Sequence, residues 1–367
     1  MIIGIDASTI KSDGGVEHLS QILNKFKFNN KIKKIYIWSS KKNLRKIRST
    51  PQIIKINNFF LNSNIIFKII WQLFFFNKEI RSAKCDLLLL CSGYQFSKKI
   101  CKRVILFQNI LPFLKNDIKN KILKFLYSKA NKTSDGTIFL SKYCKKLISK
   151  KINITNNNRV IYHGVDEIYF KKPRLRKKSN KKIINLAYVS SISHDKNQLN
   201  LLEALVILSK KNYFFKLYLL GPLDQKIKKL FYKKIYMIKK FNKIIHKKTN
   251  SKKMIKKILE KTDISVYPSK HETFGISLLE SMANSQVICC SNRSTMPELL
   301  KDGGLYFNPE SPINIARCIE ILIKNKKLGH SLAQKSFNIA LKFSWKKCSV
   351  ETFNFLYDIS KKKNSNN

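Results

Sequence analysis

The segment from residue 268 to 280 has the residue types and spacing of a ligand site, because it places two glutamates around a predicted helix start. The β-branched run Ile264 to Tyr267 precedes it and is typical of a buried strand. Gly275 permits close backbone approach where the helix begins. The N–H groups of a first helical turn suit phosphate or hydroxyl oxygens. With Glu272 just ahead of the helix and Glu280 about two turns along it, the segment predicts a site for sugar and ribose hydroxyls.

A purely structural interpretation of these glutamates is also open. Glu272 would then be an acid that stabilises a helix N-terminus, and Glu280 a solvated residue of the helix surface. The order of strand, Pro-Ser, Glu-x-Phe-Gly and second glutamate favours a ligand site over this structural interpretation.

The elements that must position this segment follow from an alternation of short apolar runs and longer amphipathic stretches. Such alternation predicts an α/β fold of doubly wound parallel sheets with helices on both faces. Residues Ile118, Ile122, Phe125 and Leu126 show the helical spacing expected between strands. The predicted strands are 2–6, 34–38, 86–90, 103–107, 136–140, 160–162, 183–189, 215–220, 244–246, 264–267, 287–290 and 304–307.

The alternation lapses at residues 171–182, where eight cationic residues and one proline predict a loop or linker. We therefore expect two Rossmann-like domains, 1–164 closed by a terminal helix at 345–367, and 165–344. In such sheets ligands bind beyond the carboxyl ends of the strands. Four residues are expected to line a cleft between the facing domains: Gly15, Lys196, Glu272 and Glu280.

Glu272 and Glu280, with seven residues between them, resemble the Glu-x(7)-Glu signature of retaining family 4 glycosyltransferases, which have the GT-B fold. The similarity extends over nearly the whole chain and is strongest in its second half. The other similar segments are a glycine loop at 14–16, an interdomain crossover at 160–166, a phosphate-binding loop at 188–198, and stretches at 219–222, 291–298, 306–309 and 343–345.

This resemblance implies a retaining, metal-independent transferase of the hexosyltransferase type. Its nucleotide sugar is a substrate, so neither a cofactor nor a metal is expected. Glu280 would bind ribose hydroxyls and Glu272 the transferred sugar, while Lys196 neutralises a diphosphate that gains charge as the glycosidic bond breaks. The remaining donor contacts fall to Gly14, Gly15, Ser190, Ser191, Phe274, Gly275 and Ile276.

Two positions depart from the family pattern. Many relatives carry an arginine in the loop before Lys196, whereas residues 190–195 here contain none, so Lys196 is the main cation. After strand 103–107 relatives often carry a His-Asp pair, and this chain has Gln108 and Asn109. Asn109 can hydrogen-bond a sugar but cannot transfer a proton. Asn109 and His163, which lies at the expected hinge, are candidate sugar or acceptor contacts.

The formal net charge of +51 suggests an anionic partner. Only nine of the 73 basic residues are arginine, whose planar fork suits bases and phosphates, and no nucleic-acid reader motif is present. A nucleic-acid-binding protein is therefore the weaker alternative, and no nucleic-acid partner is expected. AT-rich codon usage and attraction to an anionic membrane face remain two explanations of the lysines.

The eight cysteines form no Cys-x-x-Cys pair, so we expect reduced, structural thiols and a cytoplasmic protein.

The first residues have the pattern of a strand and not of a signal peptide. Residues 59–76 are interrupted by Lys68 and are not expected to span a membrane. They predict a core helix, or alternatively a basic-aromatic membrane patch. His18, His246 and His330 are interpreted as surface or helix residues.

These inferences predict a cytoplasmic glycosyltransferase, peripheral on the cytosolic membrane face, that acts on a saccharide or lipid-linked acceptor in bacterial lipopolysaccharide or polysaccharide synthesis. The enzymatic alternative is another GT-B protein, either a nucleotide-sugar epimerase or a phosphorylase.

Overall fold

The structure is a computed structural model that describes residues 1–173, 183–238, 242–249 and 251–362. The predicted linker therefore lies outside the described residues from position 174 onwards. The chain divides into two compact units, an N-terminal unit of Met1–Gly164 with Trp345–Asn367 and a C-terminal unit of Val165–Ser344. Each unit is built on its own parallel sheet.

The N-terminal unit has a seven-stranded sheet in the order β3-β2-β1-β4-β5-β6-β7. Its central strands are continuous apolar runs because helices cover both faces; each leucine of β4 is at most 1% exposed. β3 was not predicted from the sequence, and β7 lies two residues before its predicted position. The strands are β1 (Ile2–Asp6), β2 (Lys34–Trp38), β3 (Ile53–Ile56), β4 (Leu87–Leu90), β5 (Lys102–Phe107), β6 (Gly136–Phe139) and β7 (Asn158–Val160).

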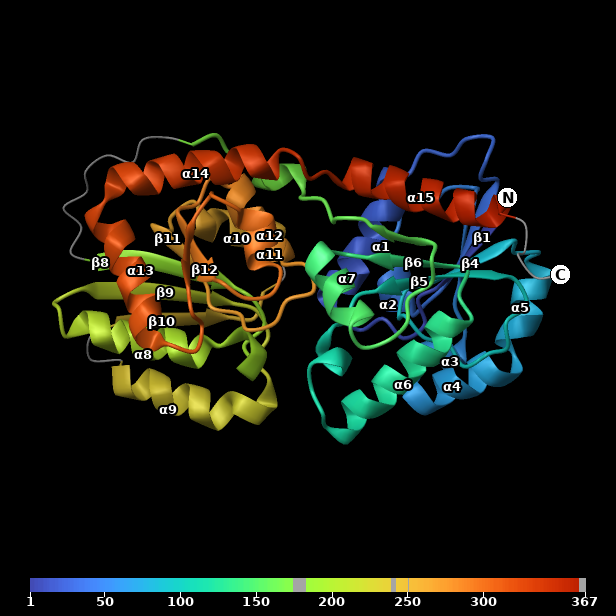
Figure 1. Cartoon of the computed structure of the whole chain (residues 1–367), viewed down its shortest axis with the longest axis horizontal. Coiled ribbons are helices and arrows are strands. Elements are labelled where there is room, and N and C mark those ends of the chain that lie inside the picture. Colours follow the sequence, from blue (N-terminus) through green and yellow to red (C-terminus); the bar gives the residue numbers. More distant parts are fainter. Residues whose placement is uncertain (174–182, 239–241, 250, 363–367) are drawn as a thin grey trace. The chain divides into compact units, whose positions relative to one another are not determined.

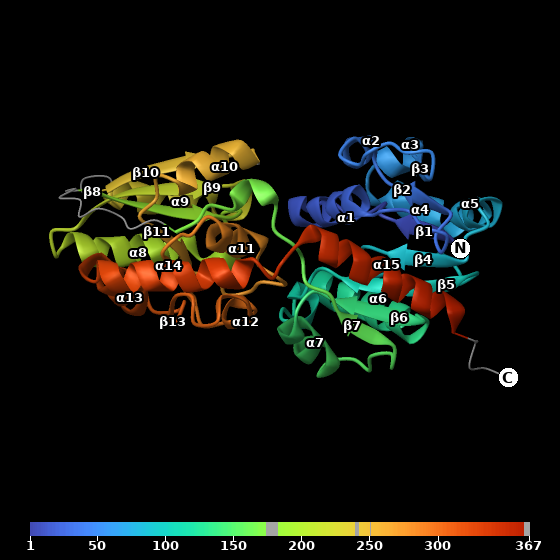
Figure 2. The ribbon, with the colours of Figure 1, turned by 90° about the horizontal axis from the view of Figure 1, so that it is seen from above.

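Helices cover the two faces of this sheet (Figure 1). They are α1 (Asp13–Lys25), α2 (Lys41–Leu44), α3 (Phe59–Asn62), α4 (Ile65–Phe74), α5 (Phe76–Ser82), α6 (Ile118–Lys132), α7 (Lys142–Ser149) and α15 (Trp345–Lys361). The terminal helix α15 returns to this unit and packs against α1 (Figure 2). There the buried Ser349 hydroxyl donates a hydrogen bond to the Ile22 carbonyl at 2.6 Å.

The C-terminal unit has a six-stranded parallel sheet in the order β10-β9-β8-β11-β12-β13. The strands are β8 (Ile183–Val189), β9 (Phe214–Leu220), β10 (Asn242–Lys247), β11 (Ile264–Tyr267), β12 (Ile288–Ser291) and β13 (Leu305–Phe307). The helices are α8 (Gln198–Ser209), α9 (Lys228–Ile238), α10 (Lys252–Leu259), α11 (Ile276–Ala283), α12 (Met296–Leu300), α13 (Pro312–Lys324) and α14 (Lys326–Ala340). The predicted α/β class with two parallel Rossmann-like sheets is confirmed.

The aromatic stretch 59–76 is divided among three helices and has two environments. Trp71 and Phe76 are fully buried and pack on each other with ring centroids 4.4 Å apart. Phe59 and Phe74 are 68% and 73% exposed. The predicted core helix is therefore correct for one face of this segment only. Among the described residues, no helix is both long and apolar enough to cross a membrane.

Candidate functional site

Glu272 lies in the loop after β11 and pairs with Lys196 from the loop after β8. The Lys196 ammonium donates to Glu272 Oε1, and both side chains are largely buried. The Ser269 hydroxyl donates to the same oxygen at 2.9 Å. Two residues that are 76 positions apart in the sequence thus form one charged pair at the carboxyl edge of the sheet.

The buried Tyr188 hydroxyl forms hydrogen bonds with the residues around this ion pair. The Tyr188 hydroxyl lies 2.6 Å from Ser269 Oγ and donates to the Lys196 carbonyl at 3.0 Å. Burial raises the pKa of Tyr188, and the nearby Glu272 carboxylate raises it further. The phenol is therefore neutral, and it holds the Lys196 and Glu272 loops in register.

The loop after β12 fixes the backbone of the Glu272 loop. The Ser294 hydroxyl accepts the Glu272 N–H at 2.8 Å and donates to the Glu272 carbonyl at 2.6 Å. The Thr295 hydroxyl donates to the Phe274 carbonyl at 2.7 Å. Sequence inspection did not single out these hydroxyls for this role, although the Ser-Thr pair after a strand lies where Rossmann-like sheets place their ligand loops.

Helix α11 begins at Ile276, directly after Gly275, whose φ of 101° is left-handed and suits glycine. Because Gly275 has no side chain, this N-cap makes no side-chain hydrogen bond to the first turn, which directly follows the loop that holds Glu272. Glu280 is partly buried and lies only about 6 Å along the helix from Ile276. The predicted two turns between the helix start and Glu280 were wrong, since the helix starts later than expected.

The loop after β8 is held by a glycine and an asparagine. A Cβ on Gly221, whose φ is 147°, would lie 2.3 Å from the Ser190 carbonyl oxygen, so only glycine fits beside this loop. Asn197 adopts a left-handed conformation with φ 60° and donates from Nδ2 to the Pro309 carbonyl at 2.6 Å. These contacts direct Lys196 towards Glu272, while Ser191 is exposed.

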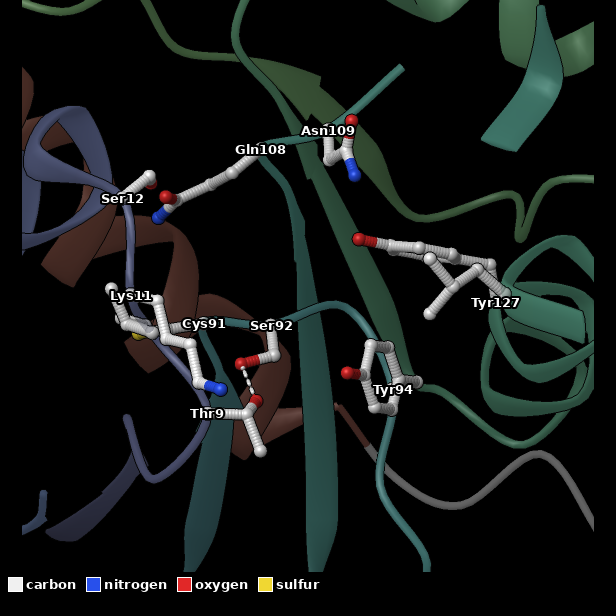
Figure 3. A pocket seen from close by; sticks show the side chains of 11 residues that line it. Thr9, Lys11, Ser12, Cys91, Ser92, Tyr94, Gln108, Asn109 and Tyr127 are labelled. Carbon is white, nitrogen blue, oxygen red and sulfur yellow. Dashed lines mark hydrogen bonds between the residues drawn. The ribbon is translucent and has the colours of Figure 1, made fainter. Parts of the chain in front are cut away.

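A pocket of about 390 Å³ lies in the N-terminal unit, beyond the carboxyl ends of β1, β4 and β5 (Figure 3). Its lining is rich in hydroxyl, amide and aromatic groups, which together with Lys11 suit a polyhydroxylated ligand. The polar and aromatic residues around it are Thr9, Lys11, Ser12, Ser92, Tyr94, Gln108, Asn109 and Tyr127. Thr9 donates a hydrogen bond to Ser92 across the pocket (Figure 3).

Two tyrosines form one wall of this pocket. The rings of Tyr94 and Tyr127 meet edge-to-face with centroids 5.6 Å apart. Burial raises the pKa of both phenols, so they remain neutral hydrogen-bonding groups. Of the pocket residues, the sequence singled out only Asn109 as a ligand contact. The others follow β1, β4 or β5 or lie on α6, and only the fold brings them to one place.

The glycines at 14 and 15 lie in the first turn of α1 and not in a free loop. A Cβ on Gly15 would lie 2.7 Å from Gln108 Oε1, so the glycine lets this pocket residue approach the helix. Gln108 Nε2 lies 3.3 Å from His18 Nδ1. Gly15 thus leaves room for the Gln108 side chain beside α1.

His18 is a residue of helix α1, as one of the two interpretations had it, but it is buried and does not lie on the surface. Its ring stacks on His163 with centroids 4.5 Å apart, and His163 packs against Trp345 at 5.3 Å. Burial lowers the pKa of His18 to about 4 and that of His163 well below its usual range. Both imidazoles are neutral packing groups of the N-terminal unit.

Residues 168–338 match the family model "Glycosyl transferases group 1". An uncharacterized glycosyltransferase of Methanocaldococcus jannaschii is 29% identical over 242 residues, which cover 64% of this chain and 62% of that protein. The "O-antigen chain mannosyltransferase B" of Escherichia coli is 32% identical over 89 residues, 24% of this chain and 23% of the relative. The alignments thus span less than two thirds of these relatives.

Anabaena HepE, solved in complex with UDP-glucose, superimposes with a TM-score of 0.73 at 16% identity, covering 98% of this chain and 100% of HepE. This likeness establishes the fold. The chain therefore has the GT-B fold of two Rossmann-like domains, and residues 168–338 are similar to the glycosyl transferases group 1 family.

Proposed function

We propose that this chain transfers a sugar from a nucleoside diphosphate sugar to a saccharide or lipid-linked acceptor, with retention of configuration and without a metal ion. The observation that carries the proposal is the Lys196–Glu272 pair beside the start of α11, within the region similar to the glycosyl transferases group 1 family. A cation, a carboxylate and an array of N–H groups are complementary to the diphosphate and hydroxyls of such a donor.

The donor is assigned to the C-terminal unit. Lys196 and the N–H groups of Gly275 and Ile276 bind the diphosphate, with Ser190 and Ser191 beside it. Glu272 orients the transferred sugar by accepting its hydroxyls, and Glu280 accepts those of the ribose. Lys196 and Glu272 form an ion pair with each other, so donor binding exchanges this charge pair for hydrogen bonds to the ligand.

The reaction breaks the bond between the anomeric carbon and the diphosphate oxygen and forms a bond to the acceptor oxygen on the same face. The acceptor proton passes to the departing phosphate oxygen, so no side chain has to act as a base. Lys196 and the first turn of α11 stabilise the charge that grows on the diphosphate. Glu272 contributes by holding the sugar in the reactive geometry.

The acceptor is assigned to the pocket of the N-terminal unit. Asn109, Gln108 and the Thr9 and Ser92 hydroxyls supply both donors and acceptors of hydrogen bonds, and the Tyr94 and Tyr127 rings supply apolar surface. Sugars present both kinds of surface. The similarity to an O-antigen mannosyltransferase supports a role in building bacterial envelope glycans. A cytoplasmic location is part of the same proposal.

The test compares Glu272→Gln and Lys196→Ala with a matched control in the same loop. Lys270 forms an exposed pair with Glu310 at 2.8 Å, so Lys270→Ala should retain wild-type turnover. Release of nucleoside diphosphate is measured over a panel of nucleotide sugars and saccharide acceptors. We expect Glu272→Gln to lose about a hundredfold in turnover and Lys196→Ala to lose both donor affinity and rate.

Wild-type turnover in both site variants would refute the assignment. Loss of activity in a chelator would contradict only the metal-free part. Conversion of the donor without any acceptor would indicate an epimerase instead, and dependence on inorganic phosphate would indicate a phosphorylase.

A further inference from the structure

Helix α6 presents an apolar stripe to solvent. Ile118, Ile122 and Phe125 recur at helical spacing on its outer side and are 78%, 56% and 65% exposed. The same spacing normally buries such residues against a sheet. Here the sheet side of the helix is occupied by Tyr127 and Asn131, which are buried. Three large apolar side chains therefore remain without a covering element among the described residues.

A second exposed apolar group lies on α3 and α4. Phe59, Ile66 and Phe74 are each more than 60% exposed. The Phe59 ring meets Phe67 edge-to-face at 5.6 Å, so α3 and α4 pack together at this surface. In Figure 1, α4 and α6 both lie along the same edge of the N-terminal unit.

The loop after β4 contacts both α4 and α6. In the stretch after β4, the Phe96 N–H donates to Gln72 Oε1 of α4 at 3.1 Å. Two residues earlier, Tyr94 packs edge-to-face on Tyr127 of α6. We call Phe59, Ile66, Phe74, Ile118, Ile122 and Phe125 the outer apolar face.

The positive charge around the outer apolar face indicates what kind of partner it binds. The helix 118–132 contains five lysines and no acidic residue, and Lys119 and Lys121 are exposed beside the apolar stripe. A second copy of a chain with net charge +51 would place like charges opposite one another. An anionic lipid surface satisfies both features, because it offers an apolar boundary for isoleucine and phenylalanine and phosphates for lysine.

The outer apolar face shares α6 with the pocket. Leu123 and Tyr127 line the pocket from the helix side that adjoins Ile122. Seating Ile118, Ile122 and Phe125 in a bilayer interface would therefore hold the pocket one helix diameter, ~10 Å, from the lipid headgroups.

We propose that the outer apolar face docks the chain on an anionic lipid bilayer and that the pocket takes the headgroup saccharide of a lipid-anchored acceptor. The second part rests on the proposed glycosyl transfer, whereas the docking itself does not. The lysines bring the chain to the surface, and the apolar side chains of α4 and α6 enter the interface.

The first experiment locates the inserted surface with Phe125→Trp. Its control is Tyr236→Trp on α9 of the C-terminal unit, a residue that is 81% exposed. Vesicles of mixed phosphatidylglycerol and phosphatidylcholine carry bromine on their acyl chains, which quenches an inserted indole. We expect quenching of the indole at 125 and none beyond wild type at 236. Equal quenching at both positions, or none at 125, would overturn the docking surface.

The second experiment removes the apolar contact with Ile122→Ser/Phe125→Ser. The control Ile313→Ser alters a side chain on α13 that is 67% exposed. We expect the double variant to bind the anionic vesicles about tenfold more weakly than wild type at a salt concentration that screens surface charge, and Ile313→Ser to bind as wild type. Unchanged binding of the double variant refutes the docking surface, as does salt-independent dimerisation that the double substitution abolishes.

Nucleotide binding separates this proposal from the proposed function. The shift in Tm on adding UDP, GDP or ADP reports the donor site and uses no vesicle. A double variant that keeps the nucleotide shift and loses vesicle binding supports the docking. No nucleotide shift in any form of the chain counts against glycosyl transfer and against the lipid-anchored acceptor, while the quenching result still decides the docking.

Discussion

Ser269→Ala should weaken the proposed donor site, although Ser269 is not assigned a contact with the donor. Ser269 is fully buried, and its hydroxyl donates to Glu272 Oε1 at 2.9 Å while lying 2.6 Å from the Tyr188 hydroxyl. The substitution removes one of the two hydrogen bonds that orient this carboxylate oxygen, and the ion pair with Lys196 remains. Ser269 is therefore a positioning residue for Glu272.

The size of the effect follows from the charge and burial of the acceptor. A hydrogen bond to a charged group contributes about 1.5–3 kcal/mol. The Glu272 side chain retains 15% exposure, so water replaces part of the lost interaction and about 1.5 kcal/mol is expected. That free energy corresponds to about a tenfold loss in kcat/KM and lowers Tm by about 3–6 °C in a unit of this size.

The assay measures donor turnover and Tm for Ser269→Ala and for a matched control, Ser349→Ala. Ser349 is equally buried but donates to the Ile22 carbonyl in the N-terminal unit. Its loss should lower Tm by a similar or smaller amount and leave turnover unchanged. In the Glu272→Gln background, Ser269→Ala should cause little further loss of turnover, because both changes disable the same carboxylate.

Two results would refute this reasoning. One is a Ser269→Ala variant that loses stability but keeps wild-type kcat/KM, which would make the serine purely structural. The other is a further tenfold loss of turnover in the Glu272→Gln background, which would show that Ser269 acts independently of Glu272.

Two other predictions concern stability. Gly221→Ala should lower the free energy of unfolding by about 2–4 kcal/mol, because the new Cβ would lie 2.3 Å from the Ser190 carbonyl oxygen at a φ of 147°. Denaturant unfolding of the variant and of wild type measures this difference. A loss below about 0.5 kcal/mol would contradict the need for glycine at this position. The pKa of His18 is about 4 in the folded state and 6.5 in the unfolded state, so the unfolded state binds more protons between these two pH values. The free energy of unfolding should therefore fall by up to about 3 kcal/mol as the pH drops from 7 to 4. His18→Phe should flatten part of the pH profile of Tm, and an identical profile in both proteins would refute the buried neutral imidazole.

The strands and the Glu272–Glu280 segment were predictable because their signals are local. A buried parallel strand is a short apolar run, and residues 87–90 are four consecutive leucines. Gly275 marks a helix start, since its left-handed backbone favours glycine. β3 was missed because Ile53–Ile56 is an edge strand with only one fully buried residue, and its apolar run is correspondingly weak.

The burial of individual side chains was not predictable from spacing. The apolar spacing on α6 favours a buried stripe, whereas a lone histidine on α1 favours an exposed side chain. The structure leaves Ile118 exposed and encloses His18 between Gln108 and His163. Periodicity shows that a helix has a distinct face, but packing partners from distant segments decide which face they cover.

The sequence by itself thus determined the α/β class, the two parallel sheets and the residues of the Glu-x(7)-Glu segment, because backbone periodicity and turn chemistry act over a few residues. Only the tertiary structure decided that Lys196 meets Glu272 across 76 positions, that Ser269, Tyr188 and Ser294 hold this pair, and that the ends of three strands enclose a pocket. The physical reason is that parallel sheets bring their carboxyl ends together only through crossovers, so neighbours at that edge come from segments far apart in the chain.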